Sequence, residues 1–295
     1  MTDTKLSADA GRGAAAAGDA DWGASLRAGR FAQAARGARR GGGAALLAAL
    51  DDLAEVEKLV RDKRYKRARR ALSRYAEQLE ADHPEASGLE KPGEAETLRG
   101  LVNTSAIDAA IAALESAESA RLHDPEALRD VLAPALAHPF TAPEAHNVLG
   151  VLRALLGENA EARAQFDRVL ALDPRHYRAL TNVGNLLLEQ GEAAQAEGYY
   201  RRALELNSEY AGAHHNLAVV LRRQRKLGAS VRSLKTSQRL MVRQSNQEGR
   251  EEARAKLGTL GQTFGGGFLR SRGGRLTLTV VLVGVAAFVL RALGG

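Results

Sequence analysis

Few residues of this 295-residue chain have the types and spacing that enzyme chemistry requires. The sequence contains no cysteine, which excludes thiolate catalysis, disulfides and cysteine-ligated metal sites. His214 and His215 are adjacent, whereas two metal ligands on one helical face would be about four residues apart. The chain has no phosphate-binding glycine loop, no His-Glu-x-x-His pair and no Gly-x-Ser-x-Gly turn. We therefore expect a protein that is not an enzyme, with no cofactor, no metal ion and no small-molecule substrate.

Positive charge is the other feature with chemical meaning. The chain has 42 Lys and Arg residues against 35 Asp and Glu, and cations are densest between Arg61 and Arg70. Such a run could contact nucleic-acid phosphates or anionic lipid headgroups. Charge runs are more often solvated helix faces, and neither zinc-finger spacing nor an RNP motif accompanies this one. We favour the solvated face and do not expect nucleic acid as a partner. A basic α-solenoid that binds nucleic acid, phosphate or lipid headgroups remains the alternative function.

One pattern occurs three times at an interval of 34 residues. Each copy has an apolar-small pair, then a small residue, then a large apolar residue. The three copies are Leu149-Gly150, Ala162 and Phe166; Val183-Gly184, Ala196 and Tyr200; and Leu217-Ala218, Ser230 and Leu234. A fixed period of this length indicates a repeat array, in which each helical hairpin buries its apolar face against its neighbours. Small residues let two helices approach closely, and we predict that Phe166 and Tyr200 fill the core beside them.

These slots resemble those of the tetratricopeptide repeat family, with units that begin at Pro143, Tyr177 and Ala211. The first two units have glycine at the turn between their helices, whereas the third has Arg225 there and departs from the family pattern in several slots. The resemblance covers roughly a third of the chain. It implies an all-α solenoid of helical hairpins that binds a protein partner rather than catalysing a reaction.

The resemblance also implies where a partner would bind. In this family the first helix of each unit lines a concave groove, and here the matching positions are rich in amides and arginines. The residues that we predict to contact a partner are Asn147, Arg178, Thr181, Asn182, Asn185, His215, Asn216, Arg222 and Arg223. Asparagine can pair with the backbone of an extended peptide, and arginine adds charge-assisted contacts to carboxylates. Of the Lys/Asn/Arg clamp with which some members hold a C-terminal carboxylate, only Asn182 is present, so we do not expect that mode.

The rest of the chain divides by composition. Residues 1–44 are rich in Ala, Gly and Arg with almost no branched apolar residues, so we predict disorder there. Residues 45–142 have helical periodicity and could be degenerate repeats or a cap on the array. We predict the array over residues 143–257, where residues 241–257 form a separate polar capping helix. Residues 258–275 are rich in glycine and predict a flexible linker.

The chain ends in an uncharged apolar run from Leu276 to Leu290. Extended to residue 293, with Arg291 reaching the interface, the run would rise about 27 Å as a helix, close to the roughly 30 Å hydrocarbon core of a bilayer. Its apolar residues surround the helix, which disfavours a surface helix. Three arginines precede the run and one follows it, so the positive-inside rule places the N-terminal part in the cytoplasm. We predict one transmembrane helix over residues 276–293, as in a tail-anchored protein of a bacterial inner membrane.

The sequence as a whole thus predicts an all-α fold, with a tetratricopeptide-type helical-hairpin solenoid and a single C-terminal transmembrane helix. The predicted function is a membrane-tethered protein–protein interaction scaffold that binds a partner peptide or acidic segment in the groove of the array.

Overall fold

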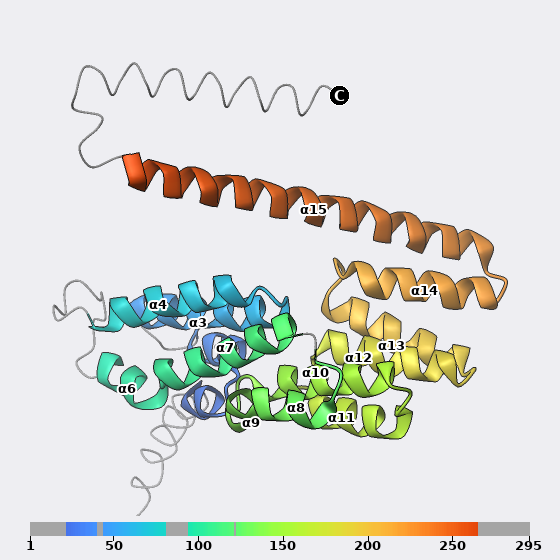
Figure 1. The fold of residues 1–295 in the computed structure, drawn as a ribbon, viewed down its shortest axis with the longest axis horizontal. Coiled ribbons are helices and arrows are strands. Elements are labelled where there is room, and N and C mark those ends of the chain that lie inside the picture. The colour runs from blue at the N-terminus through green and yellow to red at the C-terminus, as the bar shows by residue number, and fades with distance from the viewer. Residues whose placement is uncertain (1–21, 40–43, 81–93, 121, 265–295) are drawn as a thin grey trace, which may run out of the picture.

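The structure is a computed structural model that describes residues 22–39, 44–80, 94–120 and 122–264 (Figure 1). Every regular element in these ranges is helical, which confirms the all-α prediction. The helices are α2 Phe31–Ala38, α3 Ala44–Arg61, α4 Tyr65–Glu80, α6 Glu94–Leu101, α7 Thr104–Ala120, α8 Pro125–Val131, α9 Ala133–Ala137, α10 Ala142–Leu155, α11 Asn159–Leu172, α12 Tyr177–Glu189, α13 Ala193–Leu206, α14 Ala211–Arg223 and α15 Leu227–Phe264.

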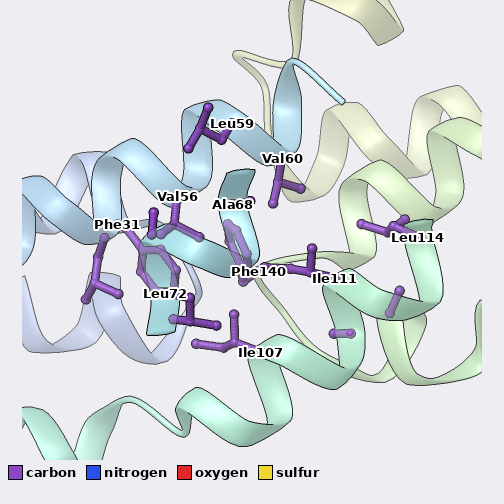
Figure 2. Packing of buried hydrophobic residues seen from close by; sticks show 14 of the residues in the cluster. Phe31, Val56, Leu59, Val60, Ala68, Leu72, Ile107, Ile111, Leu114 and Phe140 are labelled. Carbon is purple, nitrogen blue, oxygen red and sulfur yellow. The ribbon is translucent and has the colours of Figure 1, made fainter. Parts of the chain in front are cut away.

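Helices α2 to α9 form an N-terminal bundle with a continuous apolar core. Helix α3 packs on α2 and α4, and α7 packs on α4 and α9. Apolar residues at helical spacing supply this core, as Leu46, Leu50 and Leu53 do along one face of α3. Figure 2 shows Leu72 of α4 and Ile107 of α7 converging in the same cluster. The same cluster includes buried residues of α10, so the core of the bundle continues into the first helix of the array.

The prediction of disorder over residues 1–44 was wrong for residues 22–38. Residues 22–27 are helical, α2 follows, and Phe31 stacks on Phe140 with 4.7 Å between ring centroids. Gly29 makes the intervening turn with a φ of +68°, where a Cβ would collide with the backbone nitrogen of Phe140. We predicted disorder because the segment lacks branched apolar residues. Helix α2 does not need them, since it packs through three alanines and one aromatic ring. Residues 1–21 lie outside the described residues.

The three repeat units are the helical hairpins α10/α11, α12/α13 and α14/α15, which stack in sequence order (Figure 1). A Cβ added to Gly150 would lie 2.6 Å from Cε1 of Phe166, and one added to Gly184 would lie 2.7 Å from Cε1 of Tyr200. Both rings are buried. The prediction that small residues admit close crossings beside buried aromatic rings is therefore confirmed in the first two units. In the third unit, Ser230 Oγ donates to the Ala218 carbonyl oxygen at 2.7 Å.

Helix α15 is continuous over 38 residues, from Leu227 to Phe264. The predictions of a separate capping helix from residue 241 and of a linker from residue 258 were therefore wrong as far as residue 264. Single glycines cost a helix only about 1 kcal/mol each, and no proline interrupts this segment. The rest of the predicted linker and the predicted transmembrane segment, residues 276–293, lie outside the described residues. Of the helices described, none combines the length and the apolarity needed to cross a membrane.

Candidate functional site: the first-helix face of the array

The nine residues predicted to contact a partner all lie on α10, α12 and α14, the first helices of the three units. Helix α10 contacts α12, and α12 contacts α14, so the structure brings the nine residues onto one face. We call it the first-helix face. The nearly or fully buried members are Asn147, Thr181 and Arg178, the half-buried ones are Asn182, Asn185 and Asn216, and the exposed ones are His215, Arg222 and Arg223. The predicted residues thus lie close together, but they differ in how much of each side chain is exposed to solvent.

The asparagines bond to one another across adjacent units. Asn182 Nδ2 donates to Asn147 Oδ1 at 2.9 Å, and Asn216 Nδ2 donates to Asn185 Oδ1 at 2.7 Å. The hydroxyl of Tyr200 also donates to Asn185 Oδ1, at 2.8 Å. The amides predicted to pair with a peptide backbone therefore first join neighbouring first helices, and each pair leaves only part of its hydrogen-bonding capacity for a ligand.

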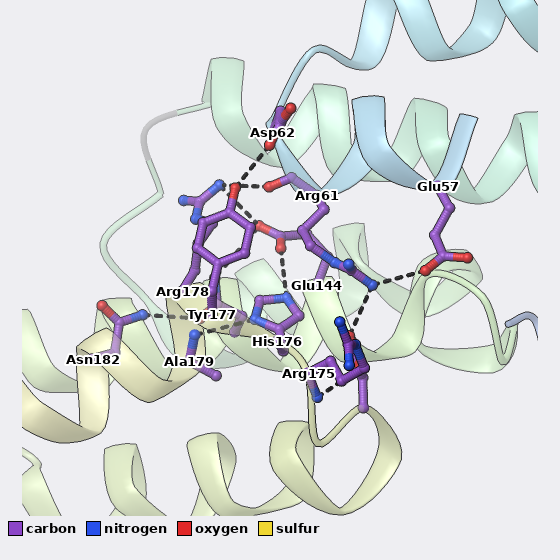
Figure 3. Close-up of polar contacts among 12 residues, drawn as sticks. Glu57, Arg61, Asp62, Glu144, Arg175, His176, Tyr177, Arg178, Ala179 and Asn182 are labelled. Atoms are coloured by element: carbon purple, nitrogen blue, oxygen red, sulfur yellow. Dashed lines mark hydrogen bonds and ion pairs between the residues drawn. The ribbon is translucent and has the colours of Figure 1, made fainter. Parts of the chain in front are cut away.

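The turn between α3 and α4 lies on the N-terminal end of the first-helix face (Figure 3). The hydroxyl of Tyr177 donates to Asp62 Oδ1 at 2.7 Å, and Arg178 Nη1 donates to the carbonyl oxygen of Arg61 at 3.3 Å. The guanidinium of Arg61 in turn pairs with Asp173 at 3.0 Å and with Glu57 at 2.8 Å. We call these contacts the joint, because they connect the N-terminal bundle to the array.

A buried carboxylate lies at the centre of the joint. Glu144 is 2% exposed and pairs with Arg178 at 3.7 Å. His176 Nδ1 accepts from the backbone N–H of Ala179, so its Nε2 carries the proton that it donates to Glu144 Oε2 at 3.1 Å. Burial alone would raise the pKa of Glu144. Arg178, the bond from His176 and Lys63 outweigh that effect and hold the pKa below its ordinary value.

The joint removes part of the predicted binding surface. Asn147 is 1% exposed, Thr181 Oγ1 donates to the carbonyl oxygen of Tyr177, and the guanidinium of Arg178 is engaged by Glu144 and Arg61. These three predicted contact residues serve the internal structure. The surface that stays open is the α14 end of the face, with the adjoining amides of α12.

The sequence reasoning missed the joint residues Glu144, His176 and Tyr177. Tyr177 bonds to Asp62 on the α3–α4 turn, 115 residues away in sequence, and His176 bonds to Glu144 from 32 residues away, so no local sequence pattern predicts these contacts. One signal was present, because Glu144 lies between Ala142 and Ala145 on the apolar face of its helix. A charged residue at such a position is rarely buried unless it is paired.

The basic run from Arg61 to Arg70 is partly neutralised inside the molecule. Arg69 forms a bidentate ion pair with Asp108, with N–O distances of 2.8 and 2.9 Å, and also lies 3.5 Å from Glu115. Arg61 has the two acidic partners described above. Cations of this run thus stabilise the packing of α4 on its neighbours. Fewer of them are left to contact phosphate groups than the sequence suggests. Among the described residues, no three His, Asp or Glu side chains converge as metal ligands would.

The fold and this face together define an all-helical array of stacked hairpins whose surface suits protein binding. The family model described as "Tetratricopeptide repeat" matches residues 156–211 and 181–236, which run from the second helix of the first unit to the first part of α15 in the third unit. Repeats of this kind form protein-interaction scaffolds.

Two solved structures similar to the chain are titled "Crystal structure of MamA" and "Crystal structure of MamA protein". Each is 18% identical to it, with TM-scores of 0.36 and 0.35. The alignments cover 64% and 68% of this chain and 95% and 94% of those chains. A search of curated proteins returned no match.

Proposed function

We propose that the array is a scaffold that binds a protein partner, as an extended peptide or acidic segment, at the α14 end of the first-helix face. The observation that carries the proposal is the composition of this open surface. Arg222 is exposed and has no partner in the described part of the chain, and Arg223 donates only to the Leu188 carbonyl oxygen, at 3.1 Å. His215 and the half-buried Asn216 lie on the same helix. Cations beside amides suit a carboxylate-bearing peptide.

The absence of cysteine permits a site-specific test of this surface. A benzophenone attached to His215→Cys should crosslink one partner protein, whereas the same label on Ala164→Cys, exposed on α11, should not. Adding Arg222→Glu and Arg223→Glu should lower the yield about tenfold or more, because charge reversal repels an acidic segment. Crosslinked products are identified by mass spectrometry. Equal crosslinking at both positions would refute the site, and loss of the product after nuclease treatment would favour nucleic acid instead.

We also propose that residues 276–293 tether the array to the cytoplasmic face of a bacterial inner membrane. The support is the uncharged apolar run and the excess of arginine before it. The full chain should remain in the membrane pellet after carbonate extraction, and a chain that ends at Gly274 should move to the soluble fraction. A matched chain in which only Gly294 and Gly295 are removed keeps the whole predicted span, serves as the control and should stay in the pellet. Pelleting of the shorter chain as before would refute the tether.

A further inference from the structure

Exposed apolar side chains follow one line along α15. Leu227, Val231 and Leu234 are exposed in its first two turns, and Met241 and Val242 continue the line about two turns later. Leu227 is 62% exposed and Val242 is 61% exposed. At about 100° per residue these five side chains fall within a band about 100° wide. We call this band the α15 stripe. A band of this width is what a helix buries when it packs against one neighbouring helix.

The first part of the stripe occupies positions that the array uses for stacking. Leu234 stands 34 residues after Tyr200, and Leu227 stands 34 residues after Ala193. Tyr200 of α13 is fully buried because α14, the first helix of the next unit, packs against it with Leu217 and Val220. Leu234 is 38% exposed, since no described helix follows α15 in the array. The stripe is therefore a helix-stacking surface that the described residues leave uncovered.

A row of cations borders the stripe. Between Glu209 and Glu248 the chain has eight Lys and Arg residues and no Asp or Glu. Three of them, Arg232, Lys235 and Arg239, lie on one flank of the stripe, about 70–130° around the helix from its centre. Within the described residues none of these three has an acidic partner, whereas the next cation, Arg243, pairs with Glu209 at 2.6 Å. The flank carries positive charge that the molecule itself does not offset.

We infer that α15 is a second docking site, which receives an amphipathic helix of a partner protein with acidic residues along one flank. The apolar face of such a helix would cover the stripe as α14 covers α13, and its carboxylates would face Arg232, Lys235 and Arg239. A second copy of this chain fits less well, because an antiparallel twofold pair of α15 helices would place the two cation rows side by side. A lipid surface fits less well too, because the stripe contains no aromatic residue and α14 occupies the other flank.

The docking site can be tested with designed helices. The probe is a fluorescein-labelled 18-residue peptide with leucines on one helical face and glutamates on one flank, and its matched control carries lysine in place of glutamate. Fluorescence anisotropy with the detergent-solubilised full chain should show at least about tenfold tighter binding of the glutamate peptide. Val231→Glu should abolish that binding. Lys235→Glu with Arg239→Glu should reverse the preference, so that the lysine peptide binds more tightly. Equal affinity for both peptides, or no reversal, would overturn the inference.

Controls separate this site from the first-helix face and from the other occupants. Arg168→Glu on α11 and the pair Arg222→Glu with Arg223→Glu should leave peptide binding unchanged, and circular dichroism should show all variants folded. A Leu234→Cys chain that forms disulfide dimers on mild oxidation would assign the stripe to a second copy. An environment-sensitive dye on Val231→Cys that reports lipid contact in vesicles with 30% phosphatidylserine would assign it to the membrane. Either result would overturn the inference.

Discussion

Replacement of Tyr200 by alanine is expected to lower the free energy of unfolding by about 3–5 kcal/mol. The Tyr200 ring is fully buried at the crossing of α12 and α13, against Gly184. Its removal leaves a cavity that neither helix can close, because the neighbouring side chains come from rigidly stacked units. The loss is measured by urea denaturation, followed by circular dichroism at the helical band.

Two matched variants show which part of Tyr200 is responsible. Tyr200→Phe keeps the ring and removes the hydroxyl that donates to Asn185, so we expect a loss of only about 1 kcal/mol. Tyr199→Ala changes the neighbouring, half-buried tyrosine, whose ring contacts the guanidinium of Arg202, and should cost less than Tyr200→Ala. Equal losses at positions 199 and 200 would contradict the packing described for the second unit.

Glu144→Gln is expected to have an effect of similar size. The substitution keeps the shape of the side chain but leaves Arg178 and Lys63 without the negative charge that offsets their burial. Breaking a buried ion pair on one side typically costs about 3–5 kcal/mol. The bundle and the array meet at this residue, so we expect unfolding of the variant to lose cooperativity between them. Glu205→Gln, at an exposed position on α13, is the matched control and should change little.

The effect of Glu144→Gln should also depend on pH. The pKa of Glu144 is lower in the folded protein than its ordinary value of 4.5. Its ionised form therefore stabilises the fold fully above about pH 4.5, and this stabilisation is lost as the pH falls through the folded-state pKa. The difference in unfolding free energy between the wild type and Glu144→Gln should be constant near neutral pH and shrink below pH 4.5. A difference that is the same at pH 3.5 and pH 7 would show that the charge of Glu144 is not responsible.

The repeat hairpins could be predicted from the sequence because their determinants are local. Gly150 and Phe166, like Gly184 and Tyr200, are 16 residues apart in one hairpin. The 34-residue repeat therefore predicts the contact between the glycine and the ring. The positions of the nine predicted contact residues on the first helices follow from the same register, and the structure places them together on one face. The sequence did not show whether the amides on that face are free to bind a ligand or are hydrogen-bonded within the protein. Asn147 and Asn182 bond to each other, and a single sequence does not distinguish an amide that awaits a ligand from one that joins two helices.

The remaining differences came from long-range contacts and from composition. The joint depends on Asp62 and Tyr177, which are 115 residues apart, and only the folded chain brings them together. Helix α2 was missed because alanine counts for little on a hydrophobicity scale yet packs tightly around Phe31. The length of α15 was underestimated because its glycines were given the weight of helix breakers, whereas in the structure the helix continues through them.

The 38 residues of α15 correspond to about 57 Å of helix, and α14, at 13 residues, supports only a minor part of that length. The remainder, about 38 Å, extends beyond α14 as a stiff arm of continuous helix. A tilt of about 5° where the arm leaves α14 would displace its far tip by about 3 Å. Small changes in how the third hairpin holds α15 would thus produce larger displacements at Phe264, the far end of the helix.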